Sequence, residues 1–180
     1  KMFNVTITNN VKEYLDCRIY MNRKGEIMVH QPHIYKHLEE KFPEIADFKH
    51  KKMNTPSMPS FKLIRVKEGE VILSPKEQKM YRCGVGVLLY LIKQMRPDLA
   101  DATSELSKAM NQANYLHWKE LVCLITFALQ TQDKGIILRP NKKSVNLSLK
   151  IFVDAEFAGD QHNRRRIMGR LIYLNNMVIG

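Results

Sequence analysis

Three carboxylates follow an apolar strand pattern late in the sequence, at Asp154, Glu156 and Asp160. The apolar pattern Ile-Phe-Val at 151–153 predicts a strand with Asp154 near its end. Side chains two positions apart on a strand point to the same face of the sheet. Asp154 and Glu156 can therefore share a Mg²⁺ ion for phosphoryl chemistry, because hard oxygen ligands suit that metal. By spacing alone an acidic surface turn is the simpler interpretation, since no second acidic cluster supplies the other ligands of a two-metal site.

Two other patterns have both a chemical and a plain interpretation. His33 and His37 stand four apart on a predicted helix, a spacing that can bind metal, but Ile34 occupies the place of the metalloprotease Glu, so an exposed pair is favoured. Gly84 and Gly86 lie inside a helical pattern, where each costs about 1 kcal/mol relative to Ala. We interpret both as close helix packing, because a phosphate-binding loop would join a strand to a helix.

Composition favours a polyanionic partner without proving one. The 180 residues are 44% hydrophobic, enough for one core or two small subdomains, and 29 Lys and Arg against 18 Asp and Glu give a formal charge of +11. Simple solubility explains such a charge about equally well. The three cysteines are odd in number and far apart, and the sequence has neither a membrane-span pattern nor a signal peptide. We therefore expect an intracellular protein, in a cytoplasmic particle or the nucleus.

Three helices are predicted in the middle of the chain, and they form the expected core. Ser74 is a good N-cap with Pro75 after it and Glu77 placed for a capping box, and Pro97 should end this helix near Met95. Pro97 or Asp98 opens a second helix, which extends to about 110, and Asn114 caps a third. Short connections make the three helices neighbours in a bundle.

Extended structure is predicted on both sides of the bundle. Residues 1–30 are predicted to form β-strands, including 14–20 and 26–30, and a helix is predicted from 31 to about 42. A proline-containing connector, 43–60, leads into the helical region. The period switches to two after 135, where strands are expected at 136–139, 147–153, 171–174 and 177–179. These last strands look like the opening of a new sheet with an unpaired edge, so we expect either a fragment or a chain that needs a partner.

Several motifs in the right order resemble the C-terminal part of a copia-type retrotransposon polyprotein. The resemblance covers nearly the whole chain and is carried by Tyr14-Leu-Asp-Cys-Arg-Ile19, Gln31 with Tyr35, Thr55-Pro56, Tyr81-Arg82, Val85-Gly86, Leu89-Tyr90-Leu91, Arg96-Pro97-Asp98, Leu106-Ser107, Met110, His117-Trp118, Val153-Asp154-Ala155, Ala158-Gly159-Asp160 and Arg164-Arg165.

The resemblance implies an α+β chain in three parts. Residues 1–60 would be the palm end of a reverse transcriptase with its connector, 61–134 a thumb- or connection-like three-helix region that holds the template–primer duplex, and 135–180 an incomplete ribonuclease H-like sheet. Asp154 would be the first metal-binding aspartate of that nuclease. The parent enzyme would use Mg²⁺, and this chain alone is expected to hold none.

Departures from the family pattern predict a chain without a complete active site. The polymerase's paired aspartates would precede Lys1, and the later nuclease carboxylates would follow Gly180. Asp16 stands where the family has Gly, and Glu156 replaces Asp. The chain would then belong to an RNA-directed DNA polymerase/ribonuclease H but be inactive as isolated, with the missing polymerase and nuclease portions as partners.

Basic residues at seven positions are the predicted contacts to an RNA–DNA hybrid or duplex: Lys93, Arg96, Lys108, Lys119, Arg164, Arg165 and Arg166. For Lys93 and Arg96, a favourable interaction with the helix dipole is an equally good explanation. The alternative function is a domesticated, non-enzymatic nucleic-acid-binding module. A freestanding metal nuclease built on Asp154 and Glu156 is the least favoured, because one strand cannot complete a metal site.

Overall fold

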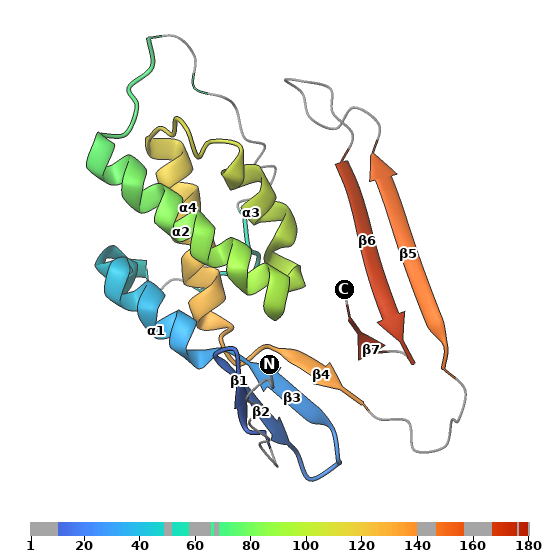
Figure 1. Cartoon of the computed structure of the whole chain (residues 1–180). Helices are drawn as coiled ribbons and strands as arrows, with labels where there is room; N and C mark the ends of the chain where they lie inside the picture. The colour runs from blue at the N-terminus through green and yellow to red at the C-terminus, as the bar shows by residue number, and fades with distance from the viewer. Residues whose placement is uncertain are drawn as a thin grey trace, which may run out of the picture. The chain divides into compact units, whose positions relative to one another are not determined.

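A computed structural model of the chain describes residues 11–48, 52–57, 66, 69–139, 147–156, 167–175 and 177–179, without the side chains of 46–48, 156 and 167. The described part combines helices with sheets and is therefore α+β (Figure 1). The chain divides into two compact units, one formed by Lys1–Arg18 with Val29–Gly135 and the other by Ile19–Met28 with Ile136–Gly180. The first unit holds the helices.

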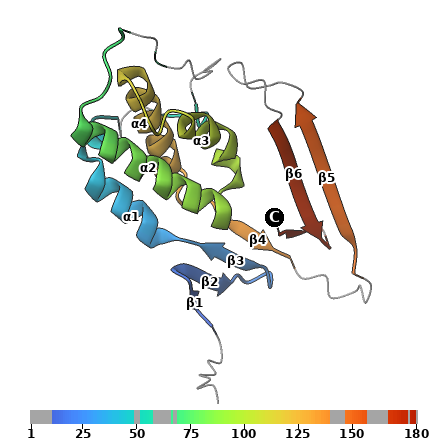
Figure 2. The ribbon, with the colours of Figure 1, turned by 45° about the horizontal axis from the view of Figure 1, so that its top comes forward.

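The helical unit is built from four α-helices and two short 3-10 helices in the described part of the chain (Figures 1 and 2). Helices α2 and α4 each contact the other three α-helices. No described helix has the length and apolar character that crossing a membrane requires. The elements are α1 (Pro32–Lys41), η1 (Pro43–Phe48), α2 (Pro75–Gln94), η2 (Pro97–Leu99), α3 (Ala100–Ser107) and α4 (Tyr115–Gln130).

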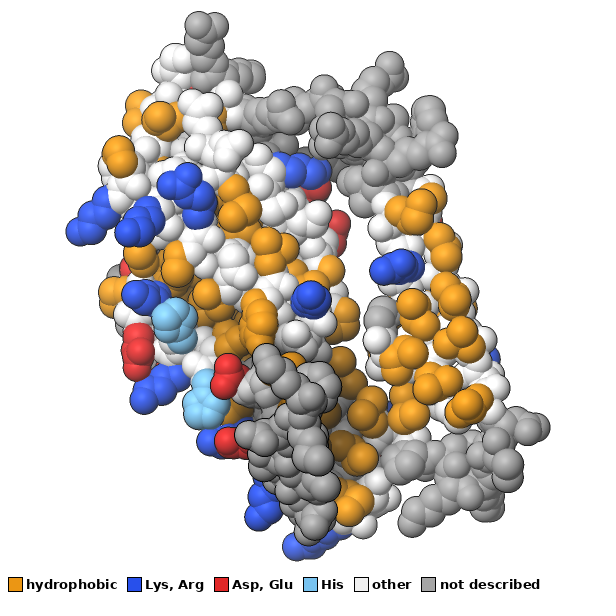
Figure 3. Space-filling model, viewed as in Figure 1, with side chains coloured by type: hydrophobic (Ala, Val, Ile, Leu, Met, Phe, Trp, Pro, Cys, Tyr) orange, Lys and Arg blue, Asp and Glu red, His pale blue; other side chains and the backbone are white. Residues whose placement is uncertain are grey.

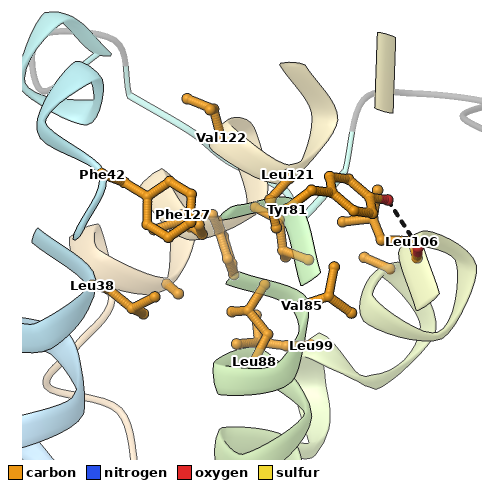
Figure 4. Packing of buried hydrophobic residues seen from close by; sticks show 14 of the residues in the cluster. Leu38, Phe42, Tyr81, Val85, Leu88, Leu99, Leu106, Leu121, Val122 and Phe127 are labelled. Atoms are coloured by element: carbon orange, nitrogen blue, oxygen red, sulfur yellow. Dashed lines mark hydrogen bonds between the residues drawn. The ribbon is translucent and has the colours of Figure 1, made fainter. Parts of the chain in front are cut away.

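Helix α4 is the centre of the core. Every residue from Glu120 to Leu129 is buried, which is the pattern of a helix surrounded by others. Helix α2 packs one stripe against it, with Tyr81, Val85 and Leu88 fully buried, while α1 contributes Leu38 and, just past its end, Phe42 (Figure 4). The three α2 residues stand at spacings of four and three, so they form the inner face of the helix.

The predicted helix ends are confirmed by their caps. The Ser74 hydroxyl accepts the Glu77 N–H, and the Glu77 carboxylate accepts the Ser74 N–H at 2.8 Å, which is a complete capping box. Asn114 caps α4 in the same way, with His117 Nδ1 accepting the Asn114 N–H at 3.0 Å. Helix α2 ends at a C-cap on Met95, two residues before Pro97. The second predicted helix is divided, because residues 97–99 form η2 before α3 begins.

The N-terminal strands form a four-stranded sheet in the order β1-β2-β3-β4. The single strand predicted over 14–20 is wrong, since Leu15 and Asp16 both have positive φ and turn the chain between two strands. Such a two-residue turn favours Gly or Asp, and Asp16 stands at the position where the resemblance led us to expect Gly. The bounds are β1 Glu13–Tyr14, β2 Cys17–Met21, β3 Ile27–His30 and β4 Ile136–Leu138.

Strand β4 corrects another prediction. Residues 136–139 were expected to open the C-terminal sheet, but β4 pairs with β3. A hydrogen-bonded ion pair between Arg139 Nε and Glu26 Oε1, at 2.6 Å, also joins the chain after β4 to the turn before β3. The pattern of alternation identifies a strand but does not specify its neighbour.

The C-terminal sheet has the order β5-β6-β7, with β5 Leu149–Glu156, β6 Ile167–Leu174 and β7 Met177–Val178. Strands β5 and β6 pair antiparallel along eight residues, from Leu149 opposite Leu174 to Glu156 opposite Ile167. Asn175 has a positive φ and lies in the connection between β6 and β7, which pair with each other. Several predictions fall outside the described residues: the strand pattern before residue 11, the carboxylate of Asp160, and Arg164, Arg165 and Arg166.

Candidate nucleic-acid interface

The outer face of α2 carries an unbroken row of exposed positions. Lys79, Arg82, Gly86, Tyr90 and Lys93 follow one another at spacings of three and four, which keeps them on one side of the helix. Basic side chains (blue) lie over the region of α2 with apolar ones (orange) between them in Figure 3. We call these five residues the α2 outer face.

The exposed charged side chains of α2 are basic, with one exception. Lys76, Lys79, Arg82 and Lys93 are exposed, and Glu77 is the single acidic residue of α2. The Glu77 carboxylate accepts hydrogen bonds from the Ser74 hydroxyl and N–H, and these bonds lower the pKa of Glu77. Because that carboxylate already serves the capping box, it is poorly placed to neutralise the basic residues further along α2. Lys76 also lies in the first turn, where the helix dipole disfavours a cation, so helix stability does not account for it.

Gly86 is open to solvent. A Cβ built on Gly86 meets nothing within 4 Å, whereas a Cβ on Gly84 lies 2.7 Å from the Phe42 ring and 3.0 Å from Leu121. The predicted close helix packing is therefore confirmed for Gly84 and wrong for Gly86. Gly86 leaves bare backbone in the middle of a basic face, in a helix where alanine is more stable by about 1 kcal/mol.

An aromatic ring follows the bare backbone by one helical turn. Tyr90 is 38% exposed and Leu89 is 42% exposed, although both lie on a well-packed helix. Interleaved basic and aromatic side chains are typical of surfaces that hold nucleic acid, since cations contact phosphates and rings contact sugars or bases. Tyr90 therefore contributes a partly exposed aromatic ring to the α2 outer face.

Buried polar contacts fix α2 in place. The Tyr81 hydroxyl donates to the Leu106 carbonyl oxygen at 2.8 Å, a bond visible in Figure 4 that joins α2 to α3. Burial raises the pKa of Tyr81, so this donor stays protonated. The Gln78 amide donates to the Met110 carbonyl and accepts the Ala113 N–H, both at 2.8 Å. The outer face is thus presented by a helix that is anchored on its opposite side.

Arg96 is not a surface cation, which corrects its prediction as a phosphate contact. It is 1% exposed, and its guanidinium makes a bidentate ion pair with Asp98 at 2.8 and 2.9 Å. It also donates to the Tyr35 hydroxyl at 3.1 Å and to the Thr131 carbonyl at 3.0 Å and hydroxyl at 2.8 Å. Arg96 therefore joins α1, the α2–η2 junction and the end of α4.

The other predicted basic contacts divide into two groups. Lys93 and Lys119 are exposed, on α2 and α4. Lys108 is half-buried and hydrogen-bonds Glu105, so part of its charge is already compensated. Sequence reasoning missed Lys76, Lys79 and Arg82, although their spacing opposite the apolar stripe was a signal that could have found them.

Asp154 lies on β5 with its side chain exposed, opposite Gly169 of β6. The Glu156 side chain lies outside the described residues. His33 and His37 are both exposed on α1. Across the described part of the chain no three His, Cys, Asp or Glu side chains come together as a metal site. Metal binding at Asp154 and Glu156 stays a prediction.

Comparison with known proteins adds an independent observation. The chain is 36% identical over 126 residues to the retrovirus-related Pol polyprotein from transposon RE2 of Arabidopsis thaliana, and 34% identical over 126 residues to that from transposon RE1. The chain is similar to part of retrotransposon Pol polyproteins. The matched region covers 70% of this chain but only 8% of each plant polyprotein. No family model and no solved structure matches the chain.

A third relative has a different kind of name. The chain is 33% identical over 95 residues to secreted RxLR effector protein 161 of Plasmopara viticola. The matched region covers 53% of this chain and 65% of that protein. A similar stretch therefore makes up most of a protein that is not named as a polyprotein.

Proposed function

We propose that the chain is the part of a copia-type Pol polyprotein that connects reverse transcriptase to ribonuclease H, and that it grips the template–primer duplex through the α2 outer face. The similarity to transposon Pol polyproteins supports the source. The ordered motifs support the copia type and the position within the polyprotein. In this proposal the polymerase and nuclease active sites are completed by other parts of the parent protein, which would use Mg²⁺.

The observation that carries the duplex-binding proposal is the bare backbone at Gly86. A glycine in a helix interior costs stability, and at Gly86 no neighbouring atom within 4 Å requires it. Glycine is also the residue that lets another molecule approach a backbone closely. The partner should be anionic and have a surface that an aromatic ring can contact, because Arg82 and Lys93 lie on either side of Gly86 and Tyr90 follows it.

Salt dependence provides the direct test. The purified chain is titrated with an RNA–DNA hybrid and with duplex DNA at several salt concentrations, beside the double variant Arg82→Ala/Lys93→Ala. Each phosphate contact removed should lower the slope of log K against log salt by about 0.9 for duplex DNA. Lys24→Ala is the matched control, since Lys24 is an exposed cation in the turn before β3. An unchanged slope in the double variant would remove the α2 outer face from the interface.

A non-enzymatic module is the second candidate, and the effector relative favours it. That relative indicates that a similar stretch can make up most of a protein with another name. The duplex-binding face would then function without polymerase or nuclease activity. Immunoblotting the endogenous product distinguishes the candidates, since a band near 21.1 kDa favours the module and a band several times larger favours the polyprotein.

A further inference from the structure

Two histidines lie one turn apart on the outer side of α1. His33 and His37 are both exposed, and both belong to the regular part of the helix, which extends from Pro32 to Lys41. Residues four apart on a helix lie on one face, with their Cβ atoms about 5–6 Å apart. Histidine side chains (pale blue) are open on the surface over the region of α1 in Figure 3. The two rings can therefore reach the same small ligand.

The nitrogen atoms of both rings are available to a ligand. Neither imidazole makes a hydrogen bond, an ion pair or a ring contact with any residue that the structure describes. His117 is a contrast, because it is buried and its Nδ1 accepts the Asn114 N–H at 3.0 Å in the cap of α4. A neutral imidazole always keeps one nitrogen with a lone pair, and on an exposed side chain that nitrogen can turn toward an ion.

The helix that carries the pair is fixed from its other side. Tyr35 is 2% and Leu38 0% exposed, and the Tyr35 hydroxyl accepts a hydrogen bond from the Arg96 guanidinium at 3.1 Å. Packing therefore holds the two histidines at a constant spacing before any ligand arrives. Once one ring binds an ion, the second is already beside it, which raises its effective concentration. Lys36, between them in the sequence, pairs with Glu40 at 3.9 Å, so its charge is partly compensated.

We propose that His33 and His37 chelate one divalent transition-metal ion of the class that prefers imidazole ligands, which includes Ni²⁺, Cu²⁺ and Zn²⁺. Two protein ligands leave the other positions of the ion to water, so the site is open, unlike a structural zinc site with four protein ligands. Ile34 follows His33 where a metalloprotease helix has Glu, so the site binds an ion without a general base beside it. Mg²⁺ prefers oxygen ligands and is excluded from this pair.

The test is isothermal titration calorimetry of the full chain with Ni²⁺, beside the single variants His33→Ala and His37→Ala. We expect each variant to bind at least about tenfold more weakly at this site, because one imidazole alone loses the benefit of the second. Each variant keeps the three cysteines and the other five histidines, so the comparison subtracts ions that are held elsewhere. Titration with Mg²⁺ should not distinguish the wild type from either variant. Equal Ni²⁺ affinity in all three proteins would overturn the proposal.

A rescue variant tests whether the spacing creates the site. Lys41 is exposed and stands four residues after His37, so His33→Ala/Lys41→His rebuilds the pair one turn further along α1. Both positions lie outside the core, and the circular dichroism should stay unchanged. The double variant should recover the affinity that His33→Ala loses, and Ni²⁺ binding no tighter than in His33→Ala would refute chelation by a pair of this spacing. The proposal does not depend on duplex binding, which is measured separately with the variants of α2.

Discussion

The Gly86→Ala variant should fold more stably than the wild-type chain and bind duplex nucleic acid more weakly. The added methyl meets no atom within 4 Å, and the helix gains about 1 kcal/mol when glycine is replaced by alanine in its interior. For a chain of this size, that gain raises the melting temperature by about 2–4 °C. If no ligand contacted the Gly86 backbone, the substitution would raise the free energy of unfolding and leave duplex affinity unchanged.

The loss of affinity follows from the space that the methyl occupies. A surface packed against the Gly86 backbone must retreat by the thickness of one methyl group, which removes on the order of ten atomic contacts at about 0.1–0.2 kcal/mol each. The resulting 1–2 kcal/mol corresponds to roughly tenfold weaker binding. Gly86→Gln has a longer side chain with good helix propensity and should weaken binding further.

Two measurements are made on each variant: urea denaturation for the free energy of unfolding, and fluorescence anisotropy titration with a labelled hybrid and a labelled DNA duplex. Ser104→Ala is the matched control, because Ser104 is exposed on α3 and its replacement also raises helix propensity. That control should gain stability with no change in affinity. If Gly86→Ala gained stability and bound both duplexes as tightly as the wild type, the inference from the bare backbone would be refuted.

Three further predictions concern the core of the helical unit. Gly84→Ala should destabilise the chain in urea denaturation, because its Cβ would lie 2.7 Å from the Phe42 ring, and a stability equal to wild type would contradict that contact. Arg96→Met should cost about 2–4 kcal/mol in the same assay, since the buried acceptors around the guanidinium lose their donor; a loss below about 0.5 kcal/mol would argue against the network. Burial opposes the ionised form of Asp98, but the Arg96 hydrogen bonds and charge outweigh it and lower the pKa of Asp98. The stability that this ion pair contributes should therefore be complete above the unfolded pKa of about 3.9 and should decline as the pH falls below it. In Asp98→Asn, the free energy of unfolding should change less with pH over that acidic range.

Local signals in the sequence were enough to place the main helices. The capping residues Ser74 and Asn114 act within three positions of themselves, so their effect is visible in the sequence alone. Pairing between distant segments was not visible. Strand β4 carries the alternation of any half-buried strand, and its place beside β3 is set by contacts between residues more than a hundred positions apart.

Arg96 illustrates why burial of a charged side chain is hard to foresee. Near the end of a helix, a cation favours the dipole and is usually solvated, so both sequence-based interpretations placed Arg96 at the surface. Its acceptors come from Tyr35 on α1 and Thr131 after α4, which are 61 and 35 positions away along the chain. Only the packing of three helices brings these groups together.

The two glycines of α2 lie in opposite environments, since Gly84 is packed in the core and Gly86 is exposed. Gly84 and Gly86 are two positions apart, which separates them by about 200° around the helix axis, so they face opposite sides. Gly84 makes room for Phe42 in the core, and its replacement is penalised by a clash. Gly86 makes room for nothing within the described chain. A glycine that the fold does not need, in the middle of a basic face, is best explained by a surface that the chain meets from outside.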